Sequence, residues 1–150
     1  MTMSAAAPNV STQSMSSDRK LVGKLVGHLY IAAKTLLEGH VSSMAEVRHE
    51  IRAIMYTGHS KMLPDGADDA MDDGASVQAW RKLVVRLIQV LKKFPDDSDC
   101  LPDSFKRDLA RSIKQGKKLC QGGGAALEEA RNQINRANLL YHKLSGASYV

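Results

Sequence analysis

Aromatic residues are scarce in this chain of 150 residues. One Trp, four Tyr and two Phe make up 5% of the sequence, although hydrophobic residues reach 43%. A hydrophobic core must therefore be built mainly from Leu, Val, Ile, Met and Ala, which suits packed helices better than a β-sandwich. Because the length allows one such core but is short for two, we predict a single all-α domain.

Motifs of catalysis and metal binding are also missing. The two cysteines, Cys100 and Cys120, lack the CxxC or Cys/His spacing of a zinc site, and no two histidines stand four residues apart. The sequence contains no G-x-S-x-G, no Walker-type glycine loop, no H-E-x-x-H and no G-x-G-x-x-G after a strand. These absences predict a protein that is not an enzyme, with no catalytic, cofactor-binding or metal-binding residues, no cofactor and no small-molecule substrate.

Long apolar segments are absent as well. No run of 18 uncharged apolar residues occurs, and the N-terminus lacks a basic stretch followed by an apolar one. Such segments are needed to span a bilayer or to act as a signal peptide. We therefore expect no membrane association and a cytoplasmic or nuclear location.

The charge is distributed unevenly along the chain. The net charge is +5, but residues 1–75 hold 7 Lys/Arg against 9 Asp/Glu, whereas residues 76–150 hold 14 against 7. The first part is therefore net −2 and the second net +7. This asymmetry predicts that any attraction to an anionic partner belongs to the second half.

The first predicted helix follows an uncharged stretch, residues 1–16, which is rich in Ser, Thr and Ala and predicts a disordered tail. Ser17 is a suitable N-cap, and Asp18 in the first turn complements the positive end of a helix. Apolar residues then recur at helical spacing as far as Gly39, which suits a left-handed stop.

A second, shorter helix is predicted to open at Ser43 and Glu46, the two members of a capping box. The short connection to the first helix predicts an antiparallel helical hairpin. Residues 58–75 then contain one Pro, three Gly and five Asp without apolar periodicity, which predicts an exposed acidic loop. The Asp residues do not have the spacing of a calcium-binding loop.

The strongest helical pattern lies in residues 76–94. Eight apolar residues recur there at helical spacing, and burying each is worth roughly 1.5–3 kcal/mol. They are Val77, Trp80, Leu83, Val84, Leu87, Ile88, Leu91 and Phe94. Basic residues occupy the opposite face, namely Arg81, Lys82, Arg86, Lys92 and Lys93. We therefore predict that this helix seeds the core and keeps its cationic face in solvent.

A fourth helix is predicted after the stop at Pro95, with Asp103 or Ser104 as its cap. One side of this helix is apolar or small and comprises Phe105, Leu109, Ser112, Ile113, Gly116 and Cys120. The helix should end at the glycines 122–124 or already at Gly116, because glycine is unfavourable inside a helix.

The last predicted helix runs from about Ala125 to Leu144. Its apolar residues alternate in steps of three and four, but over less than three heptads, so we expect it to pack within its own bundle. The complete prediction is a bundle of four or five helices, up-and-down or irregular, spanning residues 17–146, with a short tail at residues 147–150.

The absence of catalytic motifs favours a helical interaction module that docks protein partners, either as an adaptor or as an assembly subunit. Gly23 and Gly27 lie four residues apart on one face of the first helix, and small residues recur along the last one. Both patterns would let another helix approach closely, so a foreign partner and self-association as a homodimer remain alternatives.

The alternative is binding of RNA or DNA through a basic surface. If helices 77–94 and 104–120 pack as a hairpin, their outer faces could join into one such surface. The residues predicted for this surface are Arg81, Lys82, Arg86, Lys106, Arg107, Arg111, Lys114, Lys117 and Lys118. Without a helix-turn-helix signature and with few aromatic residues, only backbone contact is expected, not recognition of bases.

Overall fold

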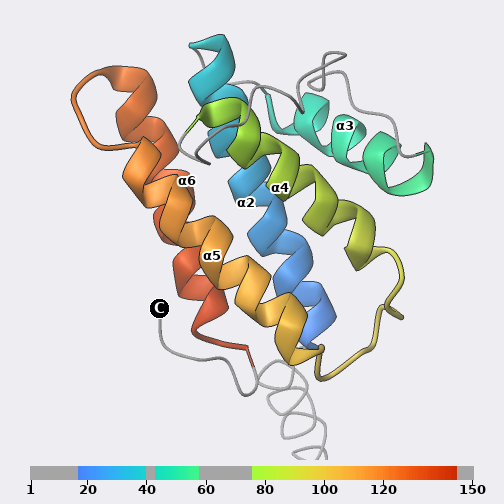
Figure 1. Ribbon diagram of the computed structural model, residues 1–150. Coiled ribbons are helices and arrows are strands. Elements are labelled where there is room, and N and C mark those ends of the chain that lie inside the picture. Colours follow the sequence, from blue (N-terminus) through green and yellow to red (C-terminus); the bar gives the residue numbers. More distant parts are fainter. Residues whose placement is uncertain (1–16, 40–42, 58–75, 145–150) are drawn as a thin grey trace, which may run out of the picture.

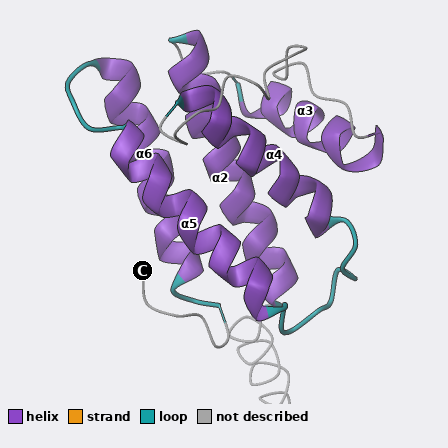
Figure 2. Ribbon diagram, viewed as in Figure 1, coloured by secondary structure: helices purple, strands orange, loops and turns teal. Residues whose placement is uncertain are grey.

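The computed structural model describes residues 17–39, 43–57 and 76–144, and this part of the chain is built from helices without any strand (Figures 1 and 2). The helices are α2 (Asp18–Glu38), α3 (Met44–Thr57), α4 (Val77–Leu91), α5 (Asp103–Leu119) and α6 (Ala125–Tyr141). The predicted all-α fold is confirmed. The predicted N-terminal tail, the acidic loop and the C-terminal tail lie outside the described residues.

Four of the helices form an up-and-down bundle. α2 packs against α4 and α6, and α5 packs against the same two helices, so the four axes enclose one core. Figure 1 shows that the chain direction alternates from α2 to α4, α5 and α6. α3 lies at the side of this bundle and packs against α2 and α4.

The centre of the bundle is α2, not the segment 76–94 for which we predicted this role. Eleven residues of α2 are buried, against seven in α4. α2 is contacted by α3, α4 and α6, and its most extensive contact is with α6. Fully buried alanines in both helices, Ala32 and Ala33 in α2 and Ala130 and Ala137 in α6, allow this close packing.

The predicted ends of α2 are confirmed. The Ser17 hydroxyl accepts a hydrogen bond from the backbone N–H of Lys20 at 3.2 Å and donates one to the carbonyl of Asp96 at 3.0 Å. Gly39 ends the helix with a φ of 81°, a left-handed conformation that glycine adopts readily. At α3, Ser43 likewise accepts a hydrogen bond from the backbone N–H of Glu46 at 3.2 Å.

Three of the other predicted helix ends need correction. α4 begins after its cap Ser76 but ends at Leu91, so Phe94 lies in the following turn. The N-cap of α5 is Pro102, not Asp103 or Ser104, because Asp103 already lies in the first turn. α6 ends at Tyr141, although Leu144 beyond it remains buried.

Trp80 joins α4 to α5. Its indole nitrogen donates a buried hydrogen bond to the carbonyl of Ser112 at 2.8 Å, and its ring lies against Gly116. A Cβ atom at Gly116 would stand 2.6 Å from Cζ2 of Trp80 and 3.0 Å from Cδ1 of Ile134. The glycine in the last turn of α5 is therefore required by close packing of α4, α5 and α6.

Replacing Gly116 with alanine should consequently destabilise the protein. Overpacking of a core costs roughly 1–3 kcal/mol, which outweighs the better helix propensity of alanine. Gly23→Ala is the matched control, because its new Cβ would meet only Nη1 of Arg19, at 3.6 Å. Urea unfolding should show a loss for Gly116→Ala and a gain of up to about 1 kcal/mol for Gly23→Ala. Equal effects of the two substitutions would contradict this packing.

Candidate functional site

The structure divides the nine predicted anion-binding residues into three groups. Arg81 and Lys106 are buried, and Lys82 is half-buried. The remaining six are exposed, and they are Arg86, Arg107, Arg111, Lys114, Lys117 and Lys118. The surface predicted from the sequence is therefore only partly available to a ligand.

Arg81 was predicted to lie on the outer face of its helix, which is wrong. Its exposed fraction is 3%. α4 is covered by α2, α3 and α5, so its buried face is wider than the apolar stripe alone indicates and includes Arg81 and Val85. Burial lowers the pKa of Arg81, although the nearby Tyr30 phenol acts in the opposite direction.

Lys106 was also predicted to face solvent and is likewise buried, at 3% exposure. Its Nζ atom lies 3.8 Å from a carboxylate oxygen of Asp18 and 3.7 Å from Sγ of Cys100. The first turn of α5 therefore lies next to the first turn of α2, where Asp18 is almost fully buried too. A buried lysine needs such a partner, so Lys106 has a structural role in this position.

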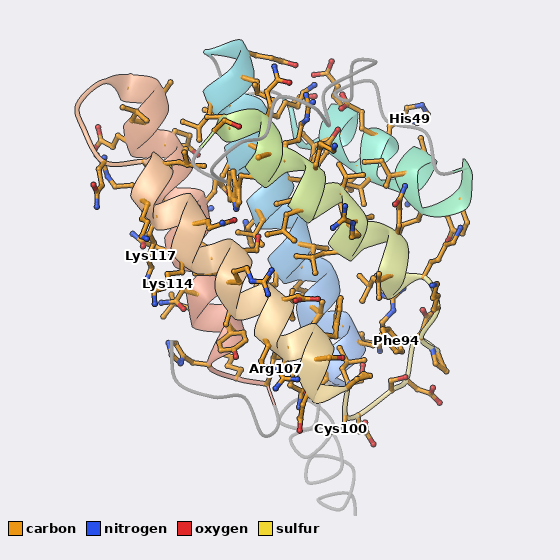
Figure 3. The ribbon with its side chains drawn as sticks, in the orientation of Figure 1. His49, Phe94, Cys100, Arg107, Lys114 and Lys117 are labelled. Atoms are coloured by element: carbon orange, nitrogen blue, oxygen red, sulfur yellow. The ribbon has the colours of Figure 1, made fainter. Side chains whose placement is uncertain are left out.

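Of the three residues that α4 was predicted to contribute to the basic surface, Arg86 is the only one that is exposed. The depression beside Arg86, about 340 Å³ in volume, is lined only by residues of α4 and the turn that follows it. On α5, by contrast, Arg107, Arg111, Lys114 and Lys118 recur at helical spacing, with Lys117 beside them. In Figure 3, Lys114 and Lys117 project from the side of α5 that faces away from α4. These five cations extend over about 16 Å along α5.

A different feature lies between α2 and α3, where the structure contains a groove of about 530 Å³. Small and aliphatic residues line its floor, namely Gly23, Gly27, Ile31, Val47 and Ile51. No Trp, Tyr or Phe contributes to the lining. The volume falls within the range of roughly 300–1,000 Å³ that is typical of ligand-binding pockets.

The two glycines in this floor are not required by the packing of the chain itself. A Cβ atom at Gly27 would meet its nearest neighbour, Cδ1 of Ile51, at 3.9 Å, and one at Gly23 would also make only an ordinary contact. Each glycine costs about 1 kcal/mol relative to alanine in a helix. In contrast to Gly116, both positions could carry a Cβ atom without displacing a neighbour.

Four exposed cations border the groove. Lys20 and Lys24 are one turn apart on α2, and Arg48 and Arg52 are one turn apart on α3. None of the four forms an ion pair with another residue in the described part of the chain. Arg19, which also lines the groove, is instead bound to the carbonyl of Phe94 and to Asp96.

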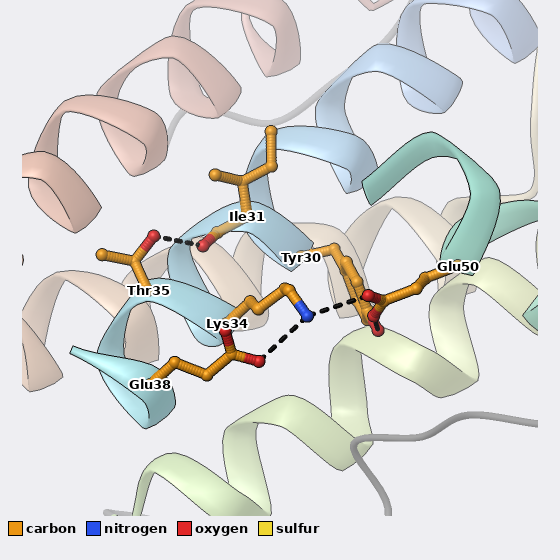
Figure 4. Close-up of polar contacts among 6 residues, drawn as sticks. All are labelled: Tyr30, Ile31, Lys34, Thr35, Glu38 and Glu50. Atoms are coloured by element: carbon orange, nitrogen blue, oxygen red, sulfur yellow. Dashed lines mark hydrogen bonds and ion pairs between the residues drawn. The ribbon is translucent and has the colours of Figure 1, made fainter. Parts of the chain in front are cut away.

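A buried polar cluster attaches α3 to α2 and so sets the position of the groove wall (Figure 4). Glu50 of α3 accepts a hydrogen bond from the Tyr30 hydroxyl at 2.7 Å and one from Nζ of Lys34 at 2.8 Å. Lys34 also pairs with Glu38 at 2.9 Å. Burial by itself lowers the pKa of Lys34, but the hydrogen bonds and charges of Glu50 and Glu38 outweigh it, so that the pKa rises above 10.5.

The cysteines do not form a disulfide, and each carries a free thiol. Cys120 is fully buried, as its place on the apolar side of the helix predicted, and burial raises the pKa of its thiol to about 11, against the opposing charge of Arg131. In the described residues, no group of three or more His, Cys, Asp or Glu side chains gathers as metal ligands would.

The four groove cations were not predicted as a site from the sequence, because only the net charge of residues 1–75, which is negative, was considered. A local signal does exist. Lys20 and Lys24 flank Gly23 at a spacing of four, and Arg48 and Arg52 have the same spacing in the next helix. Such pairs lie on one face of a helix, so summing charge over each face would have revealed them.

Removing the carboxylate of Glu50 should loosen α3. Glu50→Ala leaves the Tyr30 hydroxyl and Lys34 without their common partner, which should cost roughly 1–3 kcal/mol in urea unfolding at neutral pH.

The contribution of Lys34 to the free energy of unfolding should depend on pH. It should be fully present below pH 10.5, the ordinary pKa of lysine, and disappear as the pH rises through the higher pKa of the folded state. The stability difference between wild type and Lys34→Met should therefore shrink in strongly alkaline solution, and a difference independent of pH would contradict this assignment.

Two further findings bear on the class of the protein. None of the helices in the described part of the chain is long and apolar enough to cross a bilayer. No protein-family model matches the chain, and neither a curated protein nor a solved structure is significantly similar to it.

Proposed function

We propose that this protein is a non-catalytic interaction module that docks a protein partner in the groove between α2 and α3. The observation that carries the proposal is the apolar floor of this groove, which contains two glycines that the packing of the chain does not need. An open apolar surface is unfavourable in water unless a partner covers it. A partner that fills this space gives both glycines a role.

The groove is well suited to a helical segment. Two helices form its walls, and apart from His28 the uncharged residues that line it are small or aliphatic. Helices commonly bind other proteins by laying an apolar face into such a groove. The wall formed by α2 is rigid because its other faces are part of the bundle core, whereas α3 is an addition at the side of the bundle.

Backbone-level binding of RNA or DNA is a second candidate, supported by the exposed cations along α5. Arg107, Arg111, Lys114 and Lys118 recur along one side of the helix, and the nearest acidic residue, Asp108, makes only an exposed pair with Arg111 at 3.9 Å. Pairs of this kind contribute little in water. We rank this function second because neither Arg81 nor Lys106 adds to the surface.

The groove is tested by Gly23→Leu, which fills the floor without displacing a neighbouring backbone. Immobilised wild type should capture a protein from a nuclease-treated extract, and Gly23→Leu should retain on the order of tenfold less of it. The double variant Arg111→Glu with Lys114→Glu is the control and should capture as much as wild type. Light scattering shows whether the partner is a second copy of the chain. If Gly23→Leu captures as much of the partner as wild type does, the proposal is contradicted.

The α5 surface is tested by a gel-shift titration against duplex DNA and single-stranded RNA. If it binds nucleic acid, affinity should fall steeply with salt, and Arg111→Glu with Lys114→Glu should weaken it about tenfold or more. Gly23→Leu should have no effect, since it lies on another helix. Absence of a shift at low salt would exclude this second function.

A further inference from the structure

We infer that the groove between α2 and α3 binds an acidic amphipathic helix, whose apolar stripe lies between two rows of carboxylates. The inference rests on the proposed function and names the chemistry of the partner. It follows from the arrangement of charge around the groove, which is independent of the apolar floor.

The charge of the groove rim has one sign on both sides. Lys20 and Lys24 stand along α2, and Arg48 and Arg52 stand along α3, with no acidic side chain among the lining residues. All four cations are exposed and lack an ion-pair partner among the described residues. A partner that enters this groove must therefore bring negative charge to both of its edges.

The spacing of these cations matches that of a helix. In each wall the two cations are four residues apart, which is about 6 Å along the helix axis. Carboxylates four residues apart on a partner helix have the same separation, so each row can face one wall. Between the rows, Gly23 and Gly27 allow close approach of the partner, while Ile31, Val47 and Ile51 offer contacts to its apolar stripe.

Other occupants fit this site less well. Nucleic acid would place polar bases on a surface that is mostly aliphatic, with His28 as the one aromatic ring in the lining and no Trp, Tyr or Phe for stacking. Within the described residues, no helix of a second copy supplies two rows of carboxylates, since none carries more than two acidic residues. We therefore commit to a helix from a different protein.

The test uses three labelled synthetic peptides of equal length and measures fluorescence anisotropy. The first is helical, with a leucine stripe between two rows of Glu at a spacing of four. The second replaces each Glu with Lys, and the third has the composition of the first in a scrambled order. Wild type should bind the first about tenfold or more tightly than either of the others, and added salt should weaken this binding.

Charge reversal provides the decisive variant. Lys24→Glu with Arg48→Glu leaves one cation and one carboxylate on each wall, so it should weaken binding of the glutamate peptide and strengthen binding of the lysine peptide relative to wild type, a shift that loss of folding cannot produce. Arg111→Glu with Lys114→Glu carries the same change in net charge on α5 and should bind the glutamate peptide within about twofold of wild type. Gly23→Leu should abolish binding of both peptides.

Four outcomes would overturn the inference. Equal binding of the helical and scrambled peptides would show attraction to charge alone. Binding of phosphatidylserine vesicles through Lys24 and Arg48, without peptide binding, would identify a lipid surface as the ligand. A dimer that Gly23→Leu dissociates would identify a second copy. If none of the peptides binds, but capture of a foreign protein is still lost in Gly23→Leu, an acidic helix is excluded as the partner and the proposed docking function is retained.

Discussion

Burial of α2 is the constraint on which the rest of the structure depends. Leu25, Leu29, Ala32 and Ala33 have no exposed surface, and the heaviest packing in the molecule is between this helix and α6. Because small residues meet there, the two backbones come close, and the positions of α4 and α5 follow from closing the same core. The glycines on another side of α2 remain outside this core. One helix thus serves both as the axis of the bundle and as one wall of the groove.

Buried charges tie the surrounding elements to α2. Glu50 joins α3 to Lys34, and Lys106 joins α5 to Asp18, so each pair fixes a neighbouring helix against the central one. Breaking such a pair is costly because one charge would be left buried without a partner. These ion pairs therefore fix how the helices are arranged. In the case of α3, the pair between Glu50 and Lys34 sets the distance between the two walls of the groove.

Much of the fold could be predicted from local sequence signals. Helical periodicity located the five helices of the described residues, and the caps at Ser17 and Gly39 were found because capping depends on neighbouring residues only. Apart from the helix ends of α4, α5 and α6, the errors arose where tertiary contacts decide. Arg81 is buried because α2, α3 and α5 together cover α4, and Lys106 because α5 begins beside Asp18, which no periodicity can reveal. The groove was missed for the same reason: its two walls come from different helices.

The central claim is that the open side of α2, with α3 as its second wall, is the docking surface. It is tested most directly by residue-resolved amide NMR during titration with the helical glutamate peptide. The account predicts chemical-shift changes concentrated at residues 20–28 and 47–52, the two walls of the groove, while residues 107–118 of α5 stay unchanged. Changes centred on α5, or spread evenly over the exposed cations of the molecule, would contradict it.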